Sequence, residues 1–125
     1  MATRYRSTAR DTLPPGLRRR YDYFRKQGYP GQRALDYARA ELEAEDRGWE
    51  VRTQYEQERY EDVYGEKPPK GLDFVVVFLV DSKGEQLANL GFVPDRREDI
   101  REVGAELAME ALAESEPLFH GRRRR

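Results

Sequence analysis

The side chains with the greatest chemical capacity in this chain are charged ones, above all arginine and glutamate. The 125 residues include 23 Lys and Arg, 24 Asp and Glu, one His and no Cys. The only imidazole, His120, lies five residues before the end of the chain. A terminal position does not hold an imidazole in the fixed geometry of a serine or cysteine triad. The glycines are scattered and form no phosphate-binding loop. We therefore expect a protein that is not an enzyme and that needs no cofactor.

Arginines gather at both ends of the chain. Residues 1–27 hold eight basic and two acidic residues, residues 122–125 are all arginine, and residues 28–120 hold 11 basic and 22 acidic residues. Arginine clusters neutralise nucleic-acid phosphates, so these ends predict binding to RNA or DNA. A solubilising tail without a partner is the alternative for the last four arginines. The predicted phosphate contacts are Arg18, Arg19, Arg20, Lys67, Lys70, Arg96, Arg97, Arg122, Arg123, Arg124 and Arg125.

Five glutamates near the C-terminus follow one another at intervals of four residues. Like charges at this spacing on a helix repel by roughly 0.2–0.5 kcal/mol per pair. An acidic ridge that receives arginines explains this repetition, and a solvated helix face is the alternative. The ridge predicts a second function, that of an interaction or inhibitor protein whose acidic body binds a basic protein partner. Two helical carboxylates offer too few oxygens for a hard cation, so no metal site is predicted. The ridge consists of Glu98, Glu102, Glu106, Glu110 and Glu114.

Two helices are predicted in the first half of the chain. Pro14, Pro15 and Gly16 favour a helix start, and Gly28 and Pro30 favour its end. The apolar stripe of this first helix is Leu17, Tyr21 and Phe24. A second helix is expected over about 32–47, ending at Gly48, with the stripe Leu35, Ala38 and Leu42.

The middle of the chain predicts three strands. Residues 49–55 alternate between apolar and polar side chains, which is typical of a half-buried strand. Residues 59–71 contain two prolines and two glycines and are expected to form a long loop. The acidic, tyrosine-rich stretch 55–64 is a further candidate binding surface, and a loop with its tyrosines packed on the core is the alternative. The apolar run 72–80 predicts a central strand, and a turn over 81–84 leads into a third strand over 86–93.

The last predicted helix opens at Pro94 and Asp95 and ends near Ser115. Its apolar face is Ile100, Val103, Leu107, Ala111 and Leu112. The fold class is therefore α+β, a three-stranded antiparallel meander packed against two helices, with an additional N-terminal helix. We expect Phe74, Val76, Phe78 and Val80 to face the helices and Val75, Val77 and Leu79 to face the other side, which the first helix or a second copy would cover.

The expected organisation is one domain over 14–116, with a basic arm at 1–13 and an arginine-rich tail at 117–125. The longest apolar run is too short to cross a bilayer, and the absence of cysteine makes a cytoplasmic location the simplest expectation. A homodimer through the open sheet face is a further prediction.

The α-β-β-β-α order over about 30–114 resembles the double-stranded-RNA-binding domain. Ala105, Ala108, Ala111 and Leu112, on a helix after a glycine-containing hairpin, add to the likeness. In that family RNA is bound by the first helix, the loop between the first two strands and basic residues opening the last helix. The resemblance implies contacts from Lys67, Lys70, Arg96, Arg97 and Arg101, although the loop and lysine motifs of the family are absent.

Overall fold

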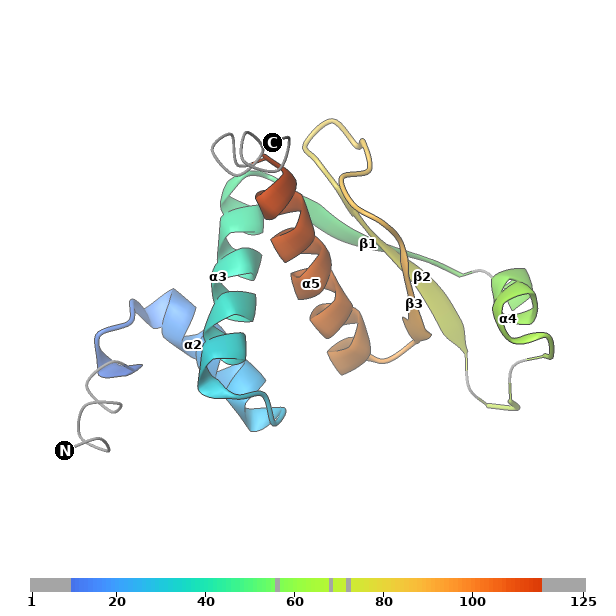
Figure 1. Ribbon diagram of the computed structural model, residues 1–125, viewed down its shortest axis with the longest axis horizontal. Coiled ribbons are helices and arrows are strands. Elements are labelled where there is room, and N and C mark those ends of the chain that lie inside the picture. Colours follow the sequence, from blue (N-terminus) through green and yellow to red (C-terminus); the bar gives the residue numbers. More distant parts are fainter. Residues whose placement is uncertain (1–9, 56, 68, 72, 116–125) are drawn as a thin grey trace, which may run out of the picture.

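The computed structural model describes residues 10–55, 57–67, 69–71 and 73–115. Its elements are α2 (Pro15–Lys26), α3 (Gly31–Asp46), β1 (Glu50–Tyr55), α4 (Gln57–Tyr64), β2 (Phe74–Val80), β3 (Gly91–Pro94) and α5 (Arg97–Ser115). The three strands form an antiparallel sheet in the order β1-β2-β3. Figure 1 shows α3 and α5 side by side next to the sheet, with α4 at the far end of the sheet from α2. The predicted α+β class and the central position of β2 are confirmed.

The two N-terminal helices start and end where their proline and glycine residues predict. Pro15 opens α2, and Gly28, with φ of 102°, follows its end. Gly48, with φ of 79°, follows α3. A φ in this left-handed range is readily adopted by glycine, which lacks a Cβ. Leu17 and Phe24 of the predicted stripe are buried.

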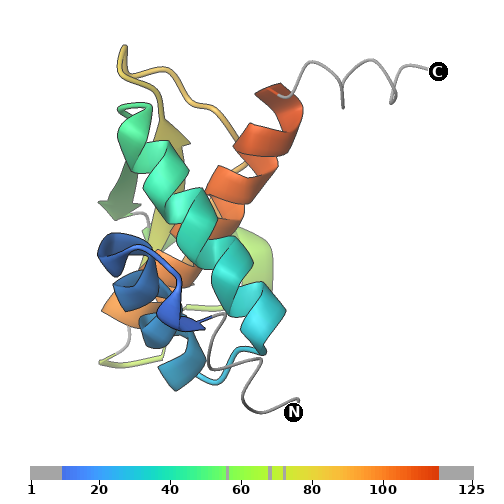
Figure 2. The same cartoon turned by 90° about the vertical axis from the view of Figure 1, so that its left-hand side faces the viewer.

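The buried face of α3 differs from the predicted one. Leu35 and Leu42 are only partly buried, and of the predicted stripe Ala38 alone is fully buried. The reason is that α3 packs between α2 and α5 and therefore needs a wide face of small side chains that permits close approach (Figure 2). The buried residues of α3 are Ala34, Tyr37, Ala38, Ala40 and Ala44.

The two faces of β2 are reversed relative to the prediction. Val75, Val77 and Leu79 belong to the cluster that includes Leu107 and Ala108 of α5, so they face the helices. Strand alternation sends the larger Phe74 and Phe78 to the opposite face. Apolar residues occupy both faces of β2, so alternation alone could not show which face the helices cover.

The far face of the sheet is covered at one end by α4, in a segment for which we predicted a loop. Tyr60 of α4 is buried, with its ring centroid 4.7 Å from that of Phe74. Phe92 of β3 stacks on Phe74 at 5.3 Å. Helix α2, which we expected to cover the face of Val75, Val77 and Leu79, packs instead on α3. The ring centroids of Phe24 in α2 and Tyr37 in α3 lie 5.1 Å apart. The side of the sheet that we expected to be open for a homodimer is the side that the helices cover.

The remaining strands also depart from expectation. All six residues of β1 are exposed, whereas a half-buried strand was predicted. The third strand spans only Gly91–Pro94, and Gln86 forms an isolated bridge with Val80. The predicted turn is confirmed by Gly84, with φ of 86°, and by Asp81 Oδ1, which accepts hydrogen bonds from the Lys83 and Glu85 amides. Helix α5 begins at Arg97, two residues after the predicted start.

The core consists of two clusters on the helical side of the sheet. One joins the inner face of β2 to α3 and α5, and the other joins Phe24, Ala34, Tyr37 and Ala105 between α2, α3 and α5. Met109 of α5 packs against both clusters. Helix α5 therefore connects the sheet to the N-terminal helices.

Candidate binding site

A groove runs along β1 on the helical side of the sheet, and we call it the β1 groove. Its volume is about 660 Å³. Trp49, Val51 and Leu79 line it from the β1–β2 side, and small residues of α3 and α5 line it from the other. Its lining residues are Arg20, Glu41, Ala44, Glu45, Trp49, Glu50, Val51, Leu79, Asp95, Arg97, Ile100, Arg101, Gly104, Ala105 and Ala108.

Small side chains create this hollow. A Cβ at Gly104 would lie 2.9 Å from Cγ2 of Val51, so Val51 rests directly on the α5 backbone. Ala44, Ala105 and Ala108 are the other small lining residues. Val51 nevertheless stays 41% exposed. The groove thus presents apolar surface to solvent beside an edge strand.

The outer edge of β1 has main-chain groups that no other strand pairs. The Leu87 amide donates to the Leu79 carbonyl at 2.9 Å, so the main chain of Leu79 points toward the β3 side. Main-chain groups of successive strand residues point to alternate sides. Val51, the partner of Leu79 in the register, therefore directs its N–H and C=O away from β2, as do Thr53 and Tyr55. Within the described part of the chain, no other strand pairs with this edge.

The rim of the β1 groove is organised around Glu41. Its carboxylate accepts hydrogen bonds from Arg101 at 2.7 and 2.9 Å and from Arg20 at 3.2 Å. Arg20 also pairs with Glu45 at 2.9 Å. Burial alone would lower the pKa of Arg20, but the hydrogen bonds to the two glutamates outweigh it and raise the pKa. The guanidinium of Arg101 stacks 3.9 Å from the Tyr23 ring centroid. These contacts fix both arginines.

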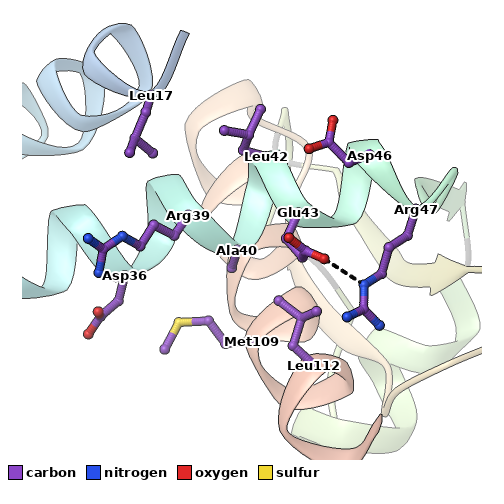
Figure 3. Close-up of a pocket in the computed structure, with 10 residues that line it drawn as sticks. All are labelled: Leu17, Asp36, Arg39, Ala40, Leu42, Glu43, Asp46, Arg47, Met109 and Leu112. Atoms are coloured by element: carbon purple, nitrogen blue, oxygen red, sulfur yellow. Dashed lines mark hydrogen bonds and ion pairs between the residues drawn. The ribbon is translucent and has the colours of Figure 1, made fainter. Parts of the chain in front are cut away.

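A second hollow lies between α2, α3 and α5 and has a volume of about 530 Å³. Figure 3 shows Met109 and Leu112 of α5 on one side of α3 and Leu17 of α2 on the other. The Glu43 carboxylate accepts a hydrogen bond from Arg47 Nε at 2.9 Å. This hollow combines apolar side chains with charged groups of both signs.

The predicted cations on α2 do not act alike. Arg18 donates to the main-chain oxygens of Asp11 and Leu13 at 2.7 and 3.0 Å, so it holds the preceding turn against the helix. Arg20 is part of the Glu41 network. Arg19 is exposed, and together with Gly16, Arg20 and Arg101 it lines a hollow that includes no carboxylate residue.

The other predicted cations lie at one end of the sheet. Lys67 and Lys70 precede β2, while Arg96 and Arg97 follow β3. The Asp95 amide donates to the Asp73 carbonyl at 2.8 Å, so the two segments approach each other at this end. The four side chains are exposed. The remaining predicted contacts, Arg122, Arg123, Arg124 and Arg125, lie outside the described residues.

The five glutamates of the acidic ridge on α5 have different surroundings. Burial and the adjacent Glu102 carboxylate raise the pKa of Tyr29, which precedes α3. Glu106 accepts a hydrogen bond from the Tyr37 hydroxyl of α3 at 2.9 Å. Glu110 accepts one from the Asn89 amide before β3 at 3.1 Å. Glu98 and Glu114 are exposed. Glu102, Glu106 and Glu110 thus also serve internal contacts.

Sequence reasoning missed the β1 groove, Glu41 and the exposed edge of β1. A sequence signal did exist, because Gly104, Ala105 and Ala108 place a small-residue face on α5. Which strand lies exposed beside this face depends on how the helices pack across the sheet, and the sequence does not show that packing.

Within the described residues, no group of three His, Asp or Glu side chains gathers where it could hold a metal ion. Among the helices of that part of the chain, none has the length and apolar character needed to span a membrane.

Comparison with known proteins gave no match: no protein-family model fits the chain, and neither a curated protein nor a solved structure is similar to it. The resemblance to the double-stranded-RNA-binding domain stays a prediction.

Proposed function

We propose that this protein is a non-catalytic interaction module that binds an extended segment of a partner protein as an added strand along β1. The observation that carries the proposal is the outer edge of β1, where Val51, Thr53 and Tyr55 direct their main-chain groups away from β2. An extended chain satisfies such groups by strand addition, and pockets beside the edge then select its side chains. The β1 groove is such a pocket.

The groove favours apolar and basic side chains in the bound segment. Alternate residues of an added strand would lie over Val51 and the small residues of α5, where apolar side chains gain contact. The rim includes four carboxylate residues and three arginines, and two of the arginines are paired with Glu41. Glu45 and Glu50 are each paired with one arginine, Arg20 and Arg52, but their side chains are 69% and 61% exposed and can also attract a basic residue of the partner. This chemistry agrees with the predicted acidic body that binds a basic protein.

A displayed library of random ten-residue peptides tests this function. We expect enrichment of peptides that combine apolar and basic residues, and slower hydrogen exchange at the Val51, Thr53 and Tyr55 amides of the protein when such a peptide is bound. Thr53→Pro removes an outward N–H without removing a β1–β2 hydrogen bond and is expected to abolish binding. Thr53→Val is the matched control and is expected to bind normally. Enriched peptides that protect other amides and ignore Thr53→Pro would contradict the proposal.

Nucleic-acid binding is a second candidate, and the hollow lined by Gly16, Arg19, Arg20 and Arg101 favours it. A cluster of guanidinium groups suits a phosphate; Arg20 and Arg101 are also paired with Glu41, which leaves the exposed Arg19 as the principal phosphate contact of this hollow. The test is duplex RNA at low salt. We expect Arg19→Ser with Arg97→Ser to weaken binding and lower its salt dependence, as should serine at positions 122–125, while Arg47→Ser serves as a charge-matched control. Absence of binding by the intact protein would exclude this candidate.

A further inference from the structure

The edge of β1 is complementary to itself. We propose that the strand that adds to β1 is the β1 strand of a second copy, so that two sheets join around a two-fold axis at Thr53. The inference rests on the proposed function, because it names the partner of the same edge. It follows from the direction of the main-chain groups, the register they allow and the side chains that this register brings together.

One antiparallel register uses every outward group of β1. With Thr53 opposite Thr53 of the second copy, Val51 lies opposite Tyr55 of the second copy, and the reverse pair forms on the other side of the axis. All three outward residues of each strand then occur in hydrogen-bonded pairs. Each such pair exchanges two hydrogen bonds, so the junction contains about six.

Other registers are poorer. A shift of one residue in the pairing would place outward main-chain groups opposite inward ones and would exchange the two side-chain faces. A shift of two residues in the pairing, in either direction, keeps every side chain on its own face of the sheet. Both of these registers form fewer hydrogen-bonded pairs within β1 than the register centred on Thr53. One of them puts Arg52 opposite Arg52 of the second copy, where like charges repel. The register centred on Thr53 puts Arg52 opposite Gln54 instead and keeps the two guanidinium groups apart.

The same register pairs exposed apolar surface. Val51 is 41% exposed and Tyr55 is 56% exposed, and both belong to the helical side of the sheet. Pairs of an aromatic and a β-branched residue opposite each other stabilise antiparallel strands. The Tyr55 hydroxyl donates to Asp73 Oδ1 of its own chain at 2.8 Å, so the exposed part of the ring is what would cover Val51 of the second copy beside Gly104, at the open side of the β1 groove. A net charge of −1 gives little repulsion between two copies.

Sedimentation velocity of the full chain over a range of concentrations tests the inference. We expect a dimer that dissociates on dilution. Thr53→Pro is expected to be monomeric at every concentration, whereas Thr53→Val dimerises like the original chain. Circular dichroism and Trp49 fluorescence check that both variants fold. A monomeric original chain at the highest concentration, or a folded Thr53→Pro variant that still dimerises, would overturn the inference.

A cross-link tests the register without a proline. The chain has no cysteine, so a single introduced thiol can pair only with its counterpart in a second copy. Residues in a hydrogen-bonded antiparallel pair have Cα atoms about 5.5 Å apart, within the range of a disulfide. Thr53→Cys is expected to oxidise to a covalent dimer. Val63→Cys, on an exposed side chain of α4, controls for random collision and is expected to stay monomeric. Equal cross-linking of the two variants would overturn the register.

The two proposals fail in different ways. If the original chain stays monomeric and Thr53→Cys does not cross-link, while library peptides still protect the β1 amides, self-pairing is wrong and strand addition by another protein stands. If no peptide protects β1 and the chain stays monomeric, both are wrong. A dimer from which added peptide releases monomer supports both.

Discussion

At the scale of single residues, Glu41 is the side chain on which most of the polar structure depends. It lies on α3 and accepts hydrogen bonds from Arg20 of α2 and Arg101 of α5. Its side chain is only 14% exposed, so water does not replace these bonds easily. The three helices are thus joined at one carboxylate.

Glu41→Gln is expected to lower the free energy of unfolding by about 1–2 kcal/mol, because two partly buried guanidinium groups lose the carboxylate that they share and Arg20 keeps only Glu45. Urea denaturation measures the change. Glu43→Gln removes an exposed pair with Arg47 on the same helix and is expected to change stability by less than about 0.5 kcal/mol. Equal effects of the two substitutions would contradict the role of Glu41.

Two tyrosines are expected to resist ionisation. Burial and the Glu102 carboxylate raise the pKa of Tyr29. Burial raises the pKa of Tyr37 as well, where the Glu106 carboxylate adds to the rise and the Arg33 guanidinium opposes it. A raised pKa favours the neutral phenol in the folded state, so this stability is complete below the ordinary value of about 10 and is lost as the pH rises above it. Tyrosinate absorbance should show that these two groups ionise late, together with alkaline unfolding. Tyr37→Phe should remove one late group, and an unchanged titration would contradict this assignment.

At the scale of elements, β3 and α5 meet where Gly91 leaves no room for a side chain. A Cβ at Gly91 would overlap Cγ1 of Val103 on α5. Val103 is β-branched and cannot easily rotate away. The approach of the two elements therefore depends on this glycine.

Gly91→Ala is expected to destabilise the fold by about 1–3 kcal/mol through overpacking. Gly16→Ala is the matched control: nothing lies within 4 Å of its added Cβ, and alanine is expected to favour α2 by up to about 1 kcal/mol. Thermal or urea denaturation of both variants measures the two effects. A neutral Gly91→Ala would show that β3 and α5 can separate without cost.

The elements that sequence reasoning located best are those with strong local signals. The helix ends are fixed by the backbone preferences of Pro15, Gly28 and Gly48. The apolar run of β2 requires the central position in the sheet. Helix α4 was missed because Pro68 and Pro69 dominated the interpretation of 59–71, although Tyr60 and Tyr64 have the spacing of one helical face. The faces of β2 and the exposure of β1 depend on where the helices pack, which no local pattern determines.

At the scale of the whole molecule, the two core clusters are expected to unfold together. Met109 contacts both, and the single tryptophan, Trp49, packs against the sheet cluster only. Phe24→Leu removes packing from the other cluster and is expected to cost about 1–2 kcal/mol. The unfolding midpoint followed by Trp49 fluorescence should therefore fall, and it should coincide with the midpoint followed by circular dichroism. A Trp49 transition that does not move would show that the clusters unfold separately.

The candidate site was only partly predictable from the whole sequence. Arg20 and Arg97 were predicted as contacts and do line the β1 groove, but they lie among Glu41, Glu45, Glu50 and Asp95. Arg20 comes from the basic first 27 residues and these carboxylates come from the acidic middle of the chain, so the division of charge along the sequence does not persist at this groove. The main-chain edge of β1 has no side-chain signature, because every residue type except proline has the same main-chain N–H and C=O groups.

The long connection through α4 between β1 and β2 has a consequence for the order of assembly. The turn that begins at Asp81 joins β2 to β3 over a shorter stretch, so closing that hairpin costs less chain entropy than recruiting β1. The strand that is added last is also the one most easily released by a local fluctuation. Each release would uncover one edge of β2, a β-branched and aromatic run without any charge, which is the type of segment that nucleates aggregation.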